Sequence, residues 1–120
     1  MATIHLTKET FIEKVYDFSK NPGSLQFKGN RPAVIDFYAQ WCGPCKMMSP
    51  VMEELSEQYE GKVDIYKIDV DQESDLAAMF NVRSIPTFVF IPMNGTIKIS
   101  MGATSKEDFS KKIQTNLLNQ

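Results

Sequence analysis

The chain has 120 residues, of which 42% are hydrophobic and 23% are charged, a profile typical of one folded domain spanning residues 1–120. The net charge is −2 with both signs dispersed, which argues against a nucleic-acid or anionic-lipid partner. No apolar run approaches the roughly 18 residues of a membrane helix, and Lys8 and Glu9 come too early for a signal peptide. We therefore expect a cytoplasmic protein, although a processed periplasmic protein would present the same sequence.

The first predicted element is an amphipathic helix within residues 6–18. Thr7 is placed to accept a hydrogen bond as its N-cap, and Leu6 to pack against Phe11 as a hydrophobic staple. The apolar side chains of its buried face recur at helical spacing: Phe11, Val15 and Phe18. This face predicts that the helix packs on a core.

A loop, a buried strand and a second helix follow. Residues 21–32 are rich in turn formers and predict a loop. The apolar run AVIDFYA at residues 33–39 predicts a strand buried on both faces. Residues 46–59 have helical spacing, with a kink expected at Pro50, which lacks a backbone N–H donor.

The second half of the chain predicts three more strands and a short helix. The strands are expected at residues 63–70, 87–92 and 96–101. Ser74 is expected to cap a short helix that ends near Asn81. The turn residues MNG at 93–95 indicate that the last two strands form a hairpin.

The chain is expected to end in a helix over residues 105–118, with a capping box formed by Ser105 and Asp108. The apolar face of this helix contains Phe109, Ile113 and Leu117. With a short first strand, the order β-α-β-α-β-α-β-β-α predicts an α/β fold with a central mixed sheet of about five strands and helices on both faces. A site is expected where the carboxyl end of a strand meets the next helix.

The only two cysteines of the chain, Cys42 and Cys45, lie at such a junction, directly after the strand at 33–39. A structural zinc site needs four Cys or His ligands, whereas the chain adds only His5, which we assign to a strand or the surface. A structural disulfide closing four residues would contribute roughly 2 kcal/mol, against about 3 kcal/mol for a 15-residue loop. A dithiol that opens and closes explains the placement better than either alternative.

The position of Cys42 at the start of a helix favours its thiolate, because unpaired amides and the helix dipole stabilise negative charge there. A free thiol of pKa about 8.5 is only about 3% ionised at pH 7, whereas a thiol with a pKa near 7 is half ionised. Cys45, one turn further on, is placed to attack a mixed disulfide that Cys42 has formed. The pair therefore indicates thiol–disulfide exchange.

Several motifs resemble those of the thioredoxin family. They occur in the family's order and approximate spacing: WCGPCK at 41–46, VIDFYA at 34–39, IDVDQ at 68–72, SIPTF at 84–88 and MGATSKEDF at 101–109. The resemblance covers residues 33–110 well and the first helix loosely. It implies the thioredoxin fold, with four helices flanking the sheet.

The resemblance also implies a function, namely a monomeric oxidoreductase that reduces protein disulfides through Cys42 and Cys45. It implies an upstream electron donor, either a thioredoxin reductase or a membrane thiol reductase, and no metal or organic cofactor. One alternative is an exported oxidase or isomerase of the same fold. A redox-inert interaction module is another, although intact cysteines argue against it.

Two charged residues acquire roles from the resemblance. Asp36 lies inside an apolar strand, where an unpaired carboxylate is unfavourable, and the family pattern implies a proton acceptor for Cys45. Lys67 matches the family's partner for this aspartate, although an ordinary solvated lysine on a strand is the alternative.

The resemblance further implies a substrate-binding set around the cysteines. These residues are Trp41, Gly43, Pro44, Ile85, Pro86 and Gly102. Pro86 matches a cis-proline that faces the disulfide, and Gly102 a groove glycine, although a turn glycine fits nearly as well. Trp41 is expected to cover the disulfide and contact substrate, and the Gly43–Pro44 dipeptide favours the reducing direction in this family.

Other residues near the site are expected to have structural roles. Tyr38 departs from the family, because many thioredoxins have a second tryptophan there, and the loop at 21–32 is longer than usual. Three methionines are expected to serve helix packing: Met47, Met48 and Met52. A short acidic run is expected to be a solvated strand end: Asp69, Asp71 and Glu73.

Overall fold

The computed structural model describes residues 3–17, 27–94 and 96–119. Its elements are, in chain order, β1 (Ile4–His5), α1 (Lys8–Lys14), β2 (Ala33–Tyr38), α2 (Gly43–Gln58), β3 (Asp64–Asp69), α3 (Ser74–Met79), β4 (Thr87–Ile91), β5 (Lys98–Met101) and α4 (Lys106–Leu117). Three expectations concern residues outside the described ranges: Phe18, residues 21–26 of the loop and Gly95 of the turn.

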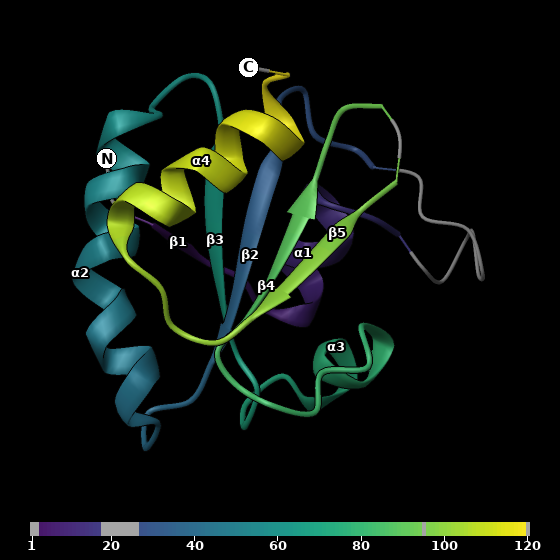
Figure 1. Ribbon diagram of the computed structural model, residues 1–120. Coiled ribbons are helices and arrows are strands. Elements are labelled where there is room, and N and C mark those ends of the chain that lie inside the picture. The colour runs from purple at the N-terminus through teal and green to yellow at the C-terminus, as the bar shows by residue number, and fades with distance from the viewer. Residues whose placement is uncertain (1–2, 18–26, 95, 120) are drawn as a thin grey trace.

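One five-stranded sheet of order β1-β3-β2-β4-β5 forms the centre of the molecule. The strands β1, β3 and β2 are parallel, whereas β4 runs antiparallel to both β2 and β5. Helices α2 and α4 pack on one face, and α1 and α3 on the other (Figure 1). The mixed sheet with four flanking helices confirms the predicted fold class.

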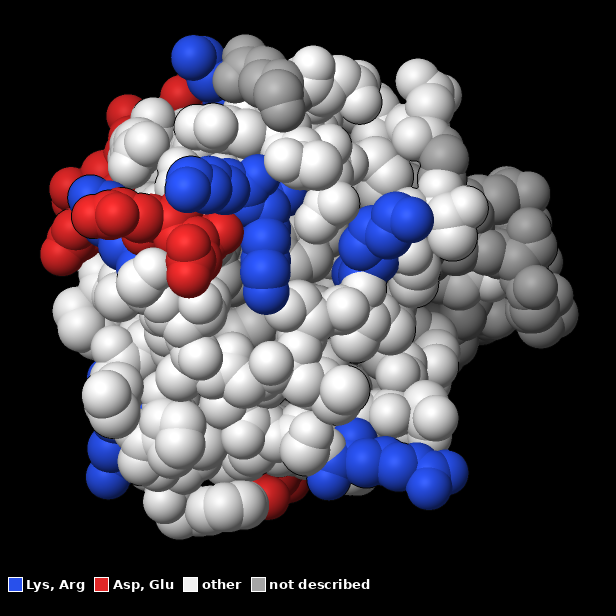
Figure 2. Space-filling model, in the orientation of Figure 1, with Lys and Arg blue, Asp and Glu red and all other residues white. Residues whose placement is uncertain are grey.

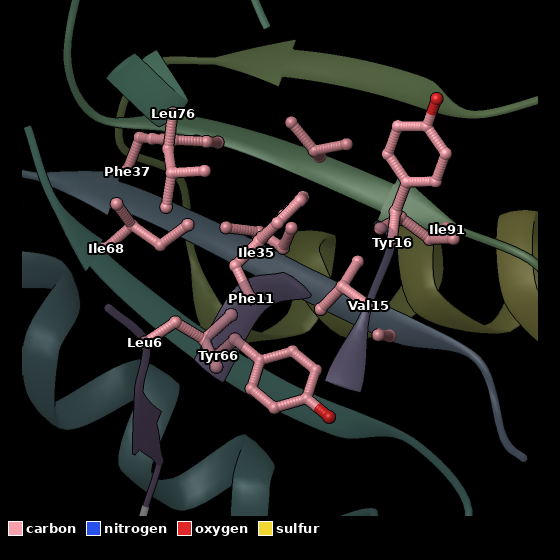
Figure 3. Close-up of a cluster of buried hydrophobic side chains, with 12 residues drawn as sticks. Leu6, Phe11, Val15, Tyr16, Ile35, Phe37, Tyr66, Ile68, Leu76 and Ile91 are labelled. Carbon is pink, nitrogen blue, oxygen red and sulfur yellow. The ribbon is translucent and has the colours of Figure 1, made fainter. Parts of the chain in front are cut away.

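The side chains of β2 alternate between two cores, because successive residues of a strand point to opposite faces. Ile35 and Phe37 join Phe11 of α1 and Leu76 of α3 in one cluster (Figure 3). Val34 points to the other face, where α2 and α4 supply buried members of the second cluster: Met48, Met52, Leu55, Phe109 and Ile113. Full burial of each such side chain contributes about 1.5–3 kcal/mol. The core therefore fixes β2 at the centre of the sheet.

Two predicted helix caps are confirmed and one is wrong. The Thr7 side chain accepts from the backbone N–H of Thr10. Ser105 accepts from that of Asp108 at 3.1 Å, which is one of the two hydrogen bonds of the predicted capping box. Ser74 is not a cap, because α3 begins one residue earlier than expected. Glu73 occupies the N-cap position of α3 and makes no side-chain capping hydrogen bond.

The helix after the cysteines begins where the cysteine pair predicts it. Helical spacing alone indicates a helix from residue 46, but α2 starts at Gly43 and continues through Pro50. Cys42 is its N-cap, which confirms the predicted place of the first cysteine at a helix start.

The contrast between Thr7 and Ser74 generates a stability prediction. Thr7→Ala removes the side-chain acceptor of one of the two capping-box hydrogen bonds at the start of α1, so the free energy of unfolding should fall by about 1 kcal/mol. Ser74→Ala removes no capping bond and should change it by less than about 0.5 kcal/mol. Urea unfolding of the two variants beside the parent chain measures both values. Equal losses would contradict the assigned caps.

Candidate active site

The two cysteines form a disulfide at the β2–α2 junction, the lower end of the molecule in Figure 1. Their Cα atoms lie 5.2 Å apart, a usual disulfide separation. Cys42 is the N-cap of α2, and its Sγ accepts the backbone N–H of Cys45 at 3.2 Å. The first turn of α2 carries no acidic residue, so no carboxylate there repels a Cys42 thiolate at the positive end of the helix dipole.

Gly43 and Pro44 form the first turn between the cysteines. Proline is well suited to this position, because the first N–H groups of a helix have no partner within it. No group of three or more potential metal ligands occurs within residues 3–17, 27–94 and 96–119.

Asp36 of β2 is a buried carboxyl group with 1% of its surface exposed. Its Oδ1 has no hydrogen-bond partner among the described residues. Burial raises the pKa of Asp36 from 3.8 to about 7, and the positive charge of Lys67 partly opposes this rise. Asp36 can therefore gain or lose a proton near neutral pH.

Lys67 of β3 is the register partner of Asp36, and side chains of paired residues share one face of the sheet. Its side chain is buried, and its Nζ donates to Ser49 Oγ of α2 at 3.3 Å. The same Nζ lies 4.5 Å from the centre of the Tyr38 ring. The alternative of a solvated strand lysine is therefore wrong.

A crevice of about 120 Å³ opens beside the second cysteine. Its lining consists of Tyr38, Ala39, Gln40, Cys45, Lys46, Ser49 and Lys67. This volume admits water, so protons can pass between solvent and the neighbourhood of Cys45.

The loop before β4 lies directly against the disulfide. Cys42 Sγ is 3.9 Å from the carbonyl oxygen of Ile85, and the Ile85–Pro86 peptide is cis. The backbone N–H of Gly102 donates to the carbonyl oxygen of Pro86 at 2.9 Å. Gly102 has a φ of +91°, which favours glycine, although a Cβ there would meet no atom within 4 Å. The structure thus brings Ile85, Pro86 and Gly102 together beside Cys42.

Trp41 is not packed closely over the disulfide, because 70% of its surface is exposed. Its Nε1 donates to Asp71 Oδ2 at 2.8 Å, and the N–H of Asp71 donates to Asp69 Oδ1 at 2.9 Å. Asp69 is buried, so the expectation of a wholly solvated acidic run is wrong. Sequence reasoning missed that these aspartates hold the tryptophan; the short spacing of Asp69 and Asp71 after a strand was the only local signal.

Exposed apolar side chains add to the surface around the disulfide. Met48 and Met52 are buried as predicted, but Met47 is 72% exposed, so its assignment to helix packing is wrong. Met101 is 69% exposed and pairs in register with Thr87, the residue after Pro86. Figure 2 shows charged side chains gathered over the upper part of this face, with further Lys or Arg and Asp or Glu side chains along its lower rim.

Comparison with known proteins gives a consistent result. The thioredoxin family model matches residues 2–115. The chain is 49% identical to a thioredoxin of Borreliella burgdorferi over 111 residues, covering 92% of this chain and 94% of that protein. It is 36% identical to a thioredoxin of Staphylococcus haemolyticus and 32% identical to thioredoxin 1 of Nostoc sp.. These two alignments cover 98% and 97% of this chain, and 100% and 98% of the relatives.

Thioredoxins generally exchange their dithiol with disulfides of other proteins and are reduced in turn by thioredoxin reductase. The Cys42–Cys45 pair at the start of α2 supplies the redox-active group for this reaction. By sequence, fold and cysteine pair, the chain belongs to the thioredoxin family and is a thiol–disulfide oxidoreductase.

Proposed function

We propose that the protein reduces disulfides of other proteins in two steps. The Cys42 thiolate attacks one sulfur of the substrate disulfide, forms a mixed disulfide and releases the other substrate sulfur as a thiolate. Cys45 then attacks Cys42 Sγ, closes the internal disulfide and releases the second substrate thiolate. Two electrons pass from the dithiol to the substrate. The observation that carries the proposal is the Cys45 N–H directed at Cys42 Sγ, which stabilises negative charge on the sulfur that attacks first.

Asp36 is the proposed proton acceptor for Cys45 in the second step. A thiol must lose its proton to attack, and a buried thiol has little contact with solvent base. The carboxyl group of Asp36 has a pKa of about 7, which suits proton transfer near neutral pH. Lys67 keeps this pKa from rising further, and the crevice beside Cys45 lets the proton reach water.

Substrate is proposed to bind as an extended segment across the disulfide. The exposed Trp41 with Gly43 and Pro44 would lie on one side, and Ile85, Pro86 and Gly102 on the other. Backbone beside Pro86 can pair with an extended chain, and such main-chain pairing suits segments of varied sequence.

The protein is proposed to act as one domain and as a monomer, with electrons supplied by a thioredoxin reductase or a membrane thiol reductase. The two sulfurs carry the electrons, so the proposed reaction requires no metal or organic cofactor. None of the helices within the described ranges has the length and apolar character needed to cross a bilayer. We propose action in the cytoplasm, or in the periplasm if the chain is a processed form.

Replacement of each cysteine separates the two steps. Cys45→Ser lacks the resolving thiol, so covalent complexes with substrate proteins should accumulate through Cys42 and dissolve on addition of dithiothreitol. Non-reducing gels and mass spectrometry of the linked peptide measure this result. Cys42→Ser should form no such complexes and should not reduce insulin. Insulin reduction by Cys42→Ser at the parental rate would disprove the proposed order of attack.

Replacement of Asp36 should change stability in a pH-dependent manner. The folded-state pKa of about 7 lies above the unfolded value near 3.8, so the folded protein holds a proton that the unfolded chain has lost between these pH values. Stability contributed by this proton is full below pH 3.8 and is lost as the pH rises through 7. The difference of about 3 units corresponds to about 4 kcal/mol at most.

Oxidised Asp36→Asn should therefore be more stable than the parent at pH 8, with the gap closing towards pH 4. Thermal melts across this range measure the effect; a gap independent of pH would contradict the burial of an ionisable Asp36. In stopped-flow reduction at pH 7, Asp36→Asn should resolve the mixed disulfide roughly tenfold more slowly or worse, with the attack by Cys42 less affected. Unchanged resolution would exclude Asp36 as the acceptor.

A further inference from the structure

A row of three polar side chains crosses the sheet beneath α2. His5 of β1 pairs in register with Lys67 of β3, which pairs with Asp36 of β2. Register partners on adjacent parallel strands point to the same face, so the row leads from the exposed edge of the sheet to the buried carboxyl group. The edge residue, His5, is exposed and has no place in the reaction steps above.

Tyr38, two residues after Asp36, contacts two members of this row, His5 and Lys67. Its hydroxyl lies 3.3 Å from His5 Nδ1, and the two rings meet edge to face with centres 6.0 Å apart. The other side of the contact is Lys67, whose Nζ lies 4.5 Å from the centre of the Tyr38 ring. Tyr38 therefore contacts an imidazole nitrogen at its hydroxyl and an ammonium group at its ring.

We propose that His5 and Tyr38 are positioning residues for the exchange reaction: their contact holds the Tyr38 ring against Lys67 and so fixes the lysine charge beside Asp36. The inference rests on the proposed role of Asp36 as proton acceptor. It adds two residues that act through Lys67 without touching substrate or the reacting sulfurs.

Two contacts position the ammonium group of Lys67. Its Nζ has Ser49 Oγ at 3.3 Å and the Tyr38 ring at 4.5 Å, and a lysine has several rotatable bonds that let it turn away. A cation over an aromatic face gains about 0.5–2 kcal/mol, depending on how far it is removed from water. A ring held at its hydroxyl keeps that contact in place, whereas a ring free to rotate towards solvent would let water reach the ammonium group.

The charge of Lys67 matters because it opposes the effect of burial on Asp36. A looser, better hydrated lysine interacts less with the carboxylate, so the pKa of Asp36 should rise. Burial, with the carboxylates of Asp69 and Asp36 nearby, raises the pKa of Tyr38, so its hydroxyl stays neutral at physiological pH.

Other titratable groups face this cluster and belong in any analysis of its pH dependence. They are Asp69 on β3, Glu53 on α2, and Cys45 and Lys46 on the crevice wall. The pKa of Glu53 is lowered mainly by its hydrogen bond with Thr3. Interactions with Lys67 and His5 lower it further by smaller amounts. In the oxidised protein Cys45 does not titrate, which removes its coupling to Asp36.

The test is the pKa of Asp36 in the oxidised protein, measured from the carboxyl ¹³C chemical shift across pH 4–10. Tyr38→Phe keeps the ring and removes the hydroxyl, and His5→Leu removes the imidazole. Each should raise the pKa of Asp36 by about 0.5 unit or more, and their double variant should raise it no further than one of them does. Amide spectra of each variant verify the fold.

Two matched variants separate the contact from other effects. His5→Asn removes the ionisable group but can place a polar atom where Nδ1 lies, so the pKa of Asp36 should stay at the parental value. Tyr66→Phe removes a hydroxyl from the opposite face of the sheet and should also leave the pKa of Asp36 unchanged.

The inference is overturned by any of three results: no shift in Tyr38→Phe or His5→Leu, an equal shift in His5→Asn, or additive shifts in the double variant. An equal shift in His5→Asn would mean that the charge of the histidine affects Asp36. Additive shifts would mean that His5 and Tyr38 act on Asp36 independently. The result is separable from the proposed function, because the pKa shift is read without turnover. Normal resolution by Asp36→Asn would remove the proposed acceptor and still leave the contact measurable.

Discussion

The hydrogen bond from the Cys45 backbone N–H to Cys42 Sγ is the interaction on which the rest of the site depends. It exists because α2 begins at Gly43, immediately after the first cysteine, so that unpaired amides of the helix point at the sulfur. The buried strand β2 ends at Tyr38, four residues before Cys42, and holds this helix start against the loop at Ile85. The sulfur of Cys42 is thereby held where a strand, a helix and a loop meet.

Burial of Asp36 beneath α2 lowers the stability of the fold above neutral pH and gives the carboxyl group a pKa of about 7. An apolar residue at that position would suit the core. Burial of a carboxyl group there raises its pKa, and its ionisation above neutral pH destabilises the fold. In the proposed mechanism, the same environment gives the second step a proton acceptor with a pKa of about 7. The positive charge of the neighbouring Lys67 opposes the effect of burial on this pKa, so the proposal extends to the residues that hold the lysine.

Local patterns in the sequence predicted most of the fold. Helical spacing located α1, α2 and α4, and the apolar run at 33–39 located the central strand. The spacing of Cys42 and Cys45 located the site by itself, because two cysteines at the start of a helix suit few other purposes. The proposed roles of Asp36 and Lys67, however, came from resemblance to thioredoxins. The strand pattern alone indicated only an unusual carboxylate and left Lys67 open.

The remaining features depend on contacts between distant segments, which local patterns do not encode. His5 meets Tyr38 and Lys67 only because β1 pairs with β3 in one particular register. Trp41 meets Asp71 because two strands end at the same edge of the sheet. Ser74 was misassigned for a smaller reason: a good capping residue was present, but the chain entered α3 one residue earlier.

The pKa of the Cys42 thiol in the reduced protein tests the central claim most directly. Cys45→Ser retains the backbone N–H at position 45 and leaves Cys42 as the only thiol, so its rate of alkylation by iodoacetamide between pH 5 and 10 follows a single ionisation. The account predicts an inflection near the general thioredoxin value of about 7, below the 8.5 or so of a free thiol. An inflection at or above about 8.5 would show that the start of α2 does not activate the sulfur, and would contradict the account.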